Sequence, residues 1–164
     1  MQTHLKKITP FLWFDKQAEE AANFYTSIFN NSKITRVVRY RATTPSGNKI
    51  GDVMTVAFQL DGLDFVALNG GPHFKFNEAV SFVVNCATQQ EIDHYWEKLS
   101  AGGDPAAQQC GWLKDKYGVS WQIVPAELSD LLSDPDPEKA ARATRAMMQM
   151  KKLDIEGLRQ STKT

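Results

Sequence analysis

The residues best suited to chemistry lie near the end of the segment 110–125. Ser120 and Gln122 stand there at alternate positions among three large apolar residues, Val119, Trp121 and Ile123. A period of two places the large apolar side chains on one face of a strand and the polar ones on the other. A hydroxyl and an amide recognise polar groups, but an amide cannot abstract a proton as a carboxylate does. The pattern predicts a helix-backed sheet, with Ser120 and Gln122 facing a ligand cavity and Trp121 in the core.

Two polar residues flank a Gly-Gly-Pro break after an apolar segment. His73 follows the break and is the one histidine placed to reach a ligand, so it is the catalytic candidate. To act as a general base, His73 needs a hydrogen-bond partner and a polarised substrate. The alternative is that His73 is an exposed loop residue without a catalytic role. Asn69 precedes the break. It either donates and accepts hydrogen bonds across the cavity or forms the turn.

Aromatic side chains supply the remaining candidates. Trp13 and Trp112 are able to stack on a planar ligand, and Phe74 and Phe76 to form a lid over it. The alternative is that these side chains belong to the core, as aromatic residues of small domains commonly do. The predicted ligand contacts are Gln122, Ser120, Asn69, Trp13, Trp112 and Phe76.

A short basic strip lies in the first half of the chain, formed by Arg36, Arg39 and Arg41, with Lys49 beyond. It either binds an anion, or it is a solvated strand edge or a dimer contact. Three arginines without interleaved aromatic residues do not indicate nucleic-acid binding.

The composition narrows the class of protein. The chain has 164 residues, and its 19 basic and 19 acidic residues cancel, so the overall charge attracts neither nucleic acid nor an anionic membrane. No apolar run approaches the roughly 20 residues of a membrane span, and the first residues do not resemble a signal peptide. We therefore expect a cytoplasmic protein. Its two cysteines, Cys86 and Cys110, are expected to be reduced and buried, with a nucleophilic Cys110 as the alternative.

Hydrophobic periodicity divides the chain into two similar halves and a tail. The first half reads as strand 8–14, helix 15–29 and strands 34–40, 53–60 and 63–69, with Asp-Gly as the last hairpin turn. The second half begins again, with a strand at 79–86, a helix at 88–100 that opens with a capping box, and the hairpin at 110–125. The remainder, 126–164, is helical. An internal duplication lets each half pack a helix on one face of a curved sheet, and the two sheets enclose a groove.

These predictions define an α+β fold. Two β-α-β-β-β repeats, at about 8–71 and 79–125, form curved mixed sheets with helices outside. We expect a duplicated domain at 1–125 and a C-terminal helical extension at 126–164.

Several motifs resemble one known superfamily. They are Phe24-Tyr25, Leu68–Pro72, Trp96–Leu99, Asp115–Gly118 and Trp121–Pro125. Together with the duplication they resemble the vicinal-oxygen-chelate superfamily of glyoxalase I, extradiol dioxygenases and bleomycin-resistance proteins, and most closely its PhnB-like branch. Some members of that branch carry the label 3-demethylubiquinone-9 3-methyltransferase. The chain lacks the glycine-rich loop and the alternating β-α order of the common class of methyl-transfer enzymes.

The resemblance also implies a site and an assembly. Metal-using members hold a divalent ion at four strand positions, which here fall at Gln122 and near 8–10, 66–68 and 79–81, none of them His, Asp or Glu. We therefore expect no metal and no cofactor. The resemblance further implies a homodimer that binds a small organic molecule in its cups. Two alternatives stay open: a lyase or isomerase with a metal at shifted positions, using His73 and Asn69, and a structural dimeric module whose own aromatic residues fill the cups.

Overall fold

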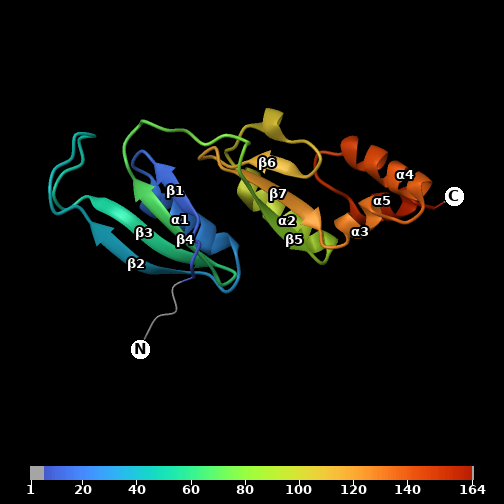
Figure 1. Cartoon of the computed structure of the whole chain (residues 1–164), viewed down its shortest axis with the longest axis horizontal. Helices are drawn as coiled ribbons and strands as arrows, with labels where there is room; N and C mark the ends of the chain where they lie inside the picture. Colours follow the sequence, from blue (N-terminus) through green and yellow to red (C-terminus); the bar gives the residue numbers. More distant parts are fainter. Residues whose placement is uncertain (1–5, 164) are drawn as a thin grey trace. The chain divides into compact units, whose positions relative to one another are not determined.

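The first sheet contains four strands in the order β1-β4-β3-β2. In a computed structural model that describes residues 6–163, these strands are β1 (Phe11–Phe14), β2 (Lys33–Arg39), β3 (Val53–Leu60) and β4 (Leu63–Asn69). Only β1 and β4 run parallel, and the other neighbours are antiparallel (Figure 1). The Asp61-Gly62 turn has positive φ at both residues, as the predicted two-residue hairpin requires.

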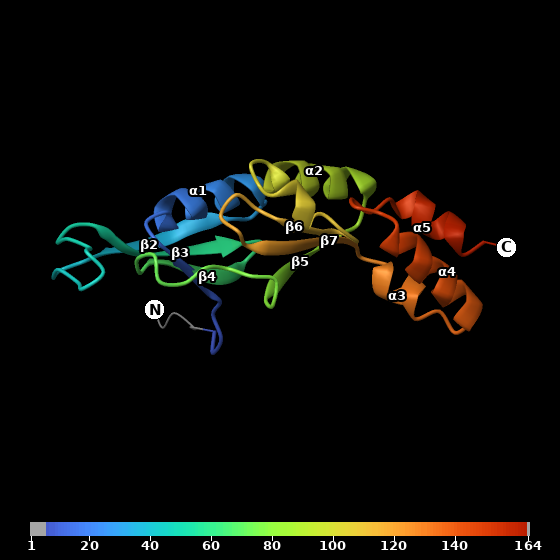
Figure 2. The same cartoon turned by 90° about the horizontal axis from the view of Figure 1, so that it is seen from above.

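Helix α1 (Ala18–Ile28) covers one face of this sheet (Figure 2). Its buried residues recur every three or four positions, so they form one apolar stripe. Beneath the stripe the Tyr25 ring stacks on Phe58, with centroids 6.2 Å apart, and Phe58 stacks on Phe65 at 5.4 Å. The core of the first unit therefore lies between α1 and strands β3 and β4.

The second sheet has three strands in the order β5-β7-β6. They are β5 (Ser81–Cys86), β6 (Trp112–Lys114) and β7 (Ser120–Pro125), and β5 is parallel to β7. The predicted second repeat is present with one strand fewer, because a 3-10 turn at Pro105–Ala107 stands where β2 stands in the first unit. Pro105 lacks an N–H for a strand ladder, and the preceding Gly102 and Gly103 offer no side chains to pack. The α+β class with helices outside two mixed sheets is confirmed.

Helix α2 (Gln89–Ser100) packs against the second sheet and begins at the predicted capping box. Thr88 Oγ1 accepts from Glu91 N at 3.2 Å, and Glu91 Oε2 accepts from Ala87 N at 2.6 Å. The Glu91 carboxylate thus accepts from the backbone N–H of Ala87, the residue before Thr88. Both bonds fix where the helix starts.

Three helices form the tail: α3 (Leu128–Leu132), α4 (Pro137–Met148) and α5 (Ile155–Ser161). Their apolar sides meet around three buried residues, Val124, Leu153 and Leu158, with Met147 and Met150 packed against them. The tail therefore belongs to the same compact unit as the second sheet, residues 76–164, and residues 1–75 form the other unit. The domain limits 1–125 and 126–164 stay a prediction. Over residues 6–163, no helix combines the length and the apolar character needed to cross a membrane.

Candidate functional site

The second sheet has one face against helix α2 and one face free of it. Leu113, Trp121 and Ile123 point to the helix side and are at most 3% exposed. Trp121 contacts Phe82, its register partner on β5, with ring centroids 5.5 Å apart. Trp121 is thus a core residue, as the alternation predicts. Residues of opposite parity lie on the other face.

Two rows of side chains cross that other face in the strand register: Ser81, Ser120 and Lys114, then Val83, Gln122 and Trp112. We call these six residues the open face. Gln122 Nε2 donates to Ser81 Oγ at 2.9 Å, which joins the two rows. Val83 is 50% exposed and Trp112 is half-buried, so apolar surface lies on both sides of this polar pair. The structure therefore brings three of the predicted contacts, Ser120, Gln122 and Trp112, onto one surface.

Ser120 is the most unusual member of the open face. Its exposure is 1%, and its Oγ has no hydrogen-bond partner in the part of the chain that the structure describes. A buried hydroxyl without a partner costs on the order of 1–3 kcal/mol. Such a group calls for a functional explanation, and a ligand that bonds to it would supply one.

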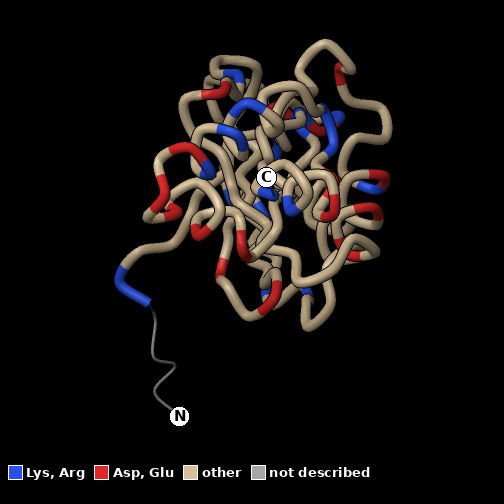
Figure 3. Tube along the Cα trace, turned by 90° about the vertical axis from the view of Figure 1, so that its right-hand side faces the viewer, with Lys and Arg blue, Asp and Glu red and all other residues tan. Residues whose placement is uncertain are grey.

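An ion pair borders the same row. Lys114 Nζ contacts Glu78 Oε1, with the lysine side chain 25% exposed and the glutamate 61% exposed. The hydrogen bond from Lys114 holds the pKa of the Glu78 carboxyl below its ordinary value. Figure 3 colours the basic and acidic residues along the trace. Phe76, another predicted contact, is half-buried in the same segment before β5.

Asp115 positions the open face from the turn before β7. This carboxylate is 2% exposed, and its Oδ1 accepts from Tyr117 N at 2.9 Å and from Val119 N at 3.1 Å. Its Oδ2 accepts from Trp121 Nε1 at 2.9 Å. The sequence predicts Asp115 as a turn residue, but it gives no sign that the same carboxylate anchors the indole of the core.

Asn69 lies in the first unit, on the helix side of its sheet. It is 7% exposed, its Oδ1 accepts from Ala18 N at 2.8 Å, and its Nδ2 donates to Val53 O at 3.1 Å. Helix α1 has no side-chain cap from Gln17, so the distant Asn69 serves as its cap. Both ends of the amide are therefore occupied by the fold, and ligand contact by Asn69 stays a prediction.

Trp13 and His73 also lie in the first unit. The Trp13 Nε1 donates to Gly71 O at 2.9 Å, and its ring meets Phe74 edge-on with centroids 4.9 Å apart. A Cβ on Gly70 would lie 2.3 Å from the indole, so only glycine fits there. His73 is exposed in the loop that follows. Trp13 is thus held on the first sheet, and Phe74 beside it is 66% exposed.

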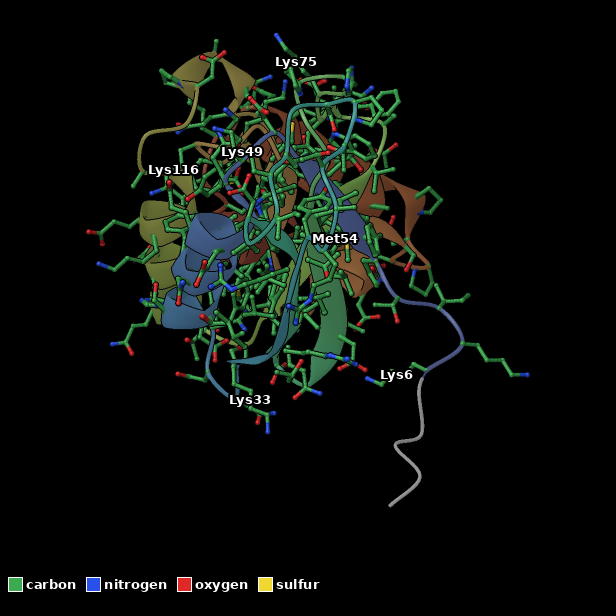
Figure 4. The ribbon with its side chains drawn as sticks, turned by 90° about the vertical axis from the view of Figure 1, so that its left-hand side faces the viewer. Lys6, Lys33, Lys49, Met54, Lys75 and Lys116 are labelled. Atoms are coloured by element: carbon green, nitrogen blue, oxygen red, sulfur yellow. The ribbon has the colours of Figure 1, made fainter. Side chains whose placement is uncertain are left out.

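The basic strip forms the wall of a groove in the first unit. The groove has a volume of about 600 Å³ and is lined by Arg36, Val37, Val38, Arg39, Tyr40, Arg41, Ala42, Thr44 and Met54. Figure 4 labels Met54 on strand β3 and Lys49 in the loop that precedes it. No carboxylate is among the lining residues. Arg39 Nη1 donates to Gly51 O at 3.0 Å, which ties the strip to the loop 40–52.

The donor set of the open face does not fit a divalent metal ion. In the second unit, the metal-ligand positions that the superfamily resemblance implies hold Ser81 and Gln122. Their hydroxyl and amide groups are neutral, weak metal ligands. Within residues 6–163 there is no group of three His, Cys, Asp or Glu residues able to hold a metal.

Burial raises the pKa of the Cys86 thiol to about 12, so that thiol stays protonated and inert. Cys110 is half-buried.

Comparisons with solved structures identify similar folds. The PhnB protein from Bacillus cereus is 41% identical, and the match covers 74% of this chain and all of that one, with a TM-score of 0.63. Protein PA1353 from Pseudomonas aeruginosa is 17% identical over 74% of this chain and 98% of its own, with a TM-score of 0.57.

A third structure is the glyoxylase/bleomycin resistance protein/dioxygenase domain from Frankia sp. EAN1pec, 16% identical over 74% of this chain and 92% of its own, with a TM-score of 0.50. The last two structures show the fold alone. No curated protein sequence matches this chain. The profile of the family described as 3-demethylubiquinone-9 3-methyltransferase matches residues 6–124. The chain therefore belongs to this family, within the PhnB-like branch of the vicinal-oxygen-chelate superfamily.

Proposed function

We propose that this protein is a cytoplasmic homodimer that binds a small organic molecule on the open face of its second sheet, without a catalytic metal. The observation that carries the proposal is the buried, unpartnered Ser120 Oγ beside the Gln122–Ser81 hydrogen bond. A ligand group that bonds to Ser120 removes the cost of leaving its hydroxyl buried and unpaired.

The open face matches a ligand with a polar end and an apolar body. Gln122 uses its Nε2 on Ser81, and its Oε1 accepts a hydrogen bond from the ligand. Val83 and Trp112 flank Gln122 on the neighbouring strands and supply apolar contact. Small-molecule sites commonly combine a few polar groups with such apolar walls.

Methyl transfer, the activity in the family's description, receives no support from the fold. Each sheet has a single parallel strand pair, whereas the doubly wound sheets of the common methyl-donor enzymes are largely parallel. The neutral donor set likewise argues against a lyase or isomerase with a metal on the open face.

Unpaired edges and apolar surface in the first unit support a homodimer. Among residues 6–163, strand β2 has a strand neighbour on one side only, so its outer edge is open to another strand. Val37 on this strand is 38% exposed, Ile50 in the next loop 67%, and Phe11 on β1 57%. Val37 and Ile50 belong to β2 and the loop after it, so a partner that pairs along β2 covers them, whereas Phe11 lies on the opposite edge strand.

A ligand screen tests the binding proposal. Compounds from a metabolite panel that bind the folded protein raise its melting temperature. We expect hits whose effect is lost in Gln122→Val and retained in Val66→Gln, a matched control at the corresponding position of the first sheet. A panel without hits, or hits unaffected by Gln122→Val, would contradict the proposal.

Native mass spectrometry tests the assembly and the metal. The expected spectrum shows a dimer without stoichiometric metal after purification in the absence of chelators. A monomer would overturn the homodimer. One metal ion per subunit would overturn the metal-free site and favour the enzyme.

A further inference from the structure

We infer that the ligand of the open face carries an oxyanion, and that Glu78 occupies the place of this oxyanion on Lys114 when no ligand is bound. The inference rests on the proposed binding function and names the chemical class of the ligand that the open face binds. Its starting point is the row Ser81, Ser120 and Lys114, which crosses all three strands of the second sheet.

This row is rich in hydrogen-bond donors. The Ser120 hydroxyl is unpartnered, and the Lys114 ammonium carries three N–H donors. Ser81 Oγ accepts from Gln122, so its own proton remains to be donated. Donors that share one row, one of them cationic and one without an acceptor, favour an oxygen-rich anion, since charged hydrogen bonds are roughly twice as strong as neutral ones.

Glu78 supplies the only carboxylate that the structure pairs with Lys114 within residues 6–163. It lies outside the sheet, in the segment that leads into β5, where Asn77 Oδ1 accepts from Ala79 N at 2.9 Å. Its side chain is 61% exposed, and ion pairs at such exposure are weak. The pair is therefore easy to exchange for another anion.

Replacement of Glu78 by the ligand's oxyanion is favourable because Glu78 pairs with only one donor of the row, Lys114. Its carboxylate contacts Lys114 and leaves Ser120 Oγ without a partner. A carboxylate or phosphate group presents several oxygens, so one such group is able to accept from Lys114 and Ser120 together. Val83 and Trp112, in the adjoining row, then contact the body of the ligand. Glu78 is thus an internal competitor of the ligand.

Calorimetric titration with three probes tests this inference: benzoate, its neutral analogue benzamide, and inorganic phosphate. Glu78→Gln removes the competitor and is expected to tighten benzoate binding about 3- to 10-fold. Lys114→Gln removes the cation and is expected to weaken it at least 10-fold. Benzamide affinity is expected to stay the same in both variants. Phosphate binding that exceeds benzoate binding would assign the oxyanion as a phosphate.

Exposed residues of helix α2 provide matched controls. Glu97→Gln and Lys98→Gln make the same changes of charge away from the open face, so neither is expected to change benzoate affinity. Equal shifts in the control variants would mean that net charge alone is at work, which overturns the inference. Melting temperatures of all variants exclude misfolding as the cause.

The outcomes separate this inference from the proposed function. If neither benzoate nor phosphate binds while neutral compounds bind in a Gln122-dependent manner, the oxyanion is wrong and the binding site stands. If benzoate binds but Glu78→Gln leaves its affinity unchanged, Glu78 is not a competitor. If no compound of any charge binds, the proposed function fails as well.

Discussion

The open faces of the two sheets share one strand register and differ in chemistry. In the first sheet Phe11 pairs with Val66, which pairs with Ala57, and this apolar stretch ends at Arg36 on β2. In the second sheet the same register carries Val83, Gln122 and Trp112. A polar amide thus stands in the second unit where the first has valine. The two sheets thus share a scaffold and differ at its centre, where the first has valine and the second an amide; the basic groups of the first unit lie at its β2 edge.

The neighbouring rows differ in whether their polar groups are satisfied. In the first sheet Gln59 pairs with Asp64, and Gln59 Nε2 donates to Asp64 Oδ1 at 2.7 Å. In the second sheet the corresponding pair is Lys114 and Ser120, and Ser120 Oγ has no partner among the described residues. A satisfied polar pair contributes to the fold, whereas the buried, unpartnered Ser120 hydroxyl gains a hydrogen bond when a ligand reaches it. The second unit is therefore where we place the function.

The largest effect is expected on the helix-facing sides, where the two units are alike. Phe58 and Trp121 are both buried beneath a helix, so Phe58→Ala and Trp121→Ala should each lower the free energy of unfolding by about 3–5 kcal/mol. Urea denaturation followed by circular dichroism measures this. A loss below about 1 kcal/mol in either variant would show that the two cores are not equivalent.

The turns that precede the last strand of each sheet provide a sharper contrast. Asp115→Ala removes the acceptor of three N–H donors and should cost about 2–3 kcal/mol. Asp61→Asn keeps a side chain that tolerates positive φ, so its cost should stay within about 0.5 kcal/mol. The same denaturation experiment compares them. Equal costs would contradict the anchoring role of Asp115.

Alanine substitutions in the polar rows should change stability in opposite directions. Ser120→Ala removes an unpartnered buried hydroxyl and should raise the free energy of unfolding by about 1 kcal/mol. Asp64→Ala breaks a satisfied pair and should lower it by about 0.5 kcal/mol. Calorimetric melting gives the sign of each change. Destabilisation by Ser120→Ala would mean that its hydroxyl already has a bonding role.

The smallest effect concerns the pH dependence of the Glu78–Lys114 pair. Because the folded-state pKa of Glu78 is lowered, the pair stabilises the fold above the ordinary pKa of glutamate. This contribution disappears as the pH falls through the lowered pKa. Lys114→Gln should return the pKa of Glu78 towards its ordinary value, as followed by NMR of the carboxyl carbon.

Asp93 is the internal control for that titration. Its pKa is also lowered, chiefly by the hydrogen bond from Lys152, and Lys114→Gln should leave it unchanged. If the pKa of Glu78 does not move in this variant, Lys114 is not the cause of its shift.

Local patterns were enough to predict most elements of the fold. The apolar spacing in α1, the capping box of α2 and the Asp61-Gly62 turn are interactions between residues a few positions apart. The missing strand of the second repeat was not predicted, although Pro105 and the two glycines before it disfavour a strand at that place. The role of Asn69 was likewise hidden, since it caps a helix that begins 51 residues earlier.

The candidate site shows the same division. Alternation in β7 was enough to place Ser120 and Gln122 opposite Trp121, because side-chain direction in a strand follows from parity. Ser81, the hydrogen-bond partner of Gln122, comes from β5, and Lys114, the register neighbour of Ser120, comes from β6. Trp13 and Asn69, predicted as contacts of the same ligand, lie in the first unit, and their contact with a ligand stays a prediction.

The sequence by itself determined the duplicated α+β scaffold, the family, and which side of β7 carries polar groups, since these depend on short-range periodicity and motifs. Only the tertiary structure decided that Ser120 is buried without a partner and that Ser81, Ser120 and Lys114 share one row. Burial and hydrogen bonding depend on which strands pair and in which register. That information belongs to contacts between distant segments, and no local pattern contains it.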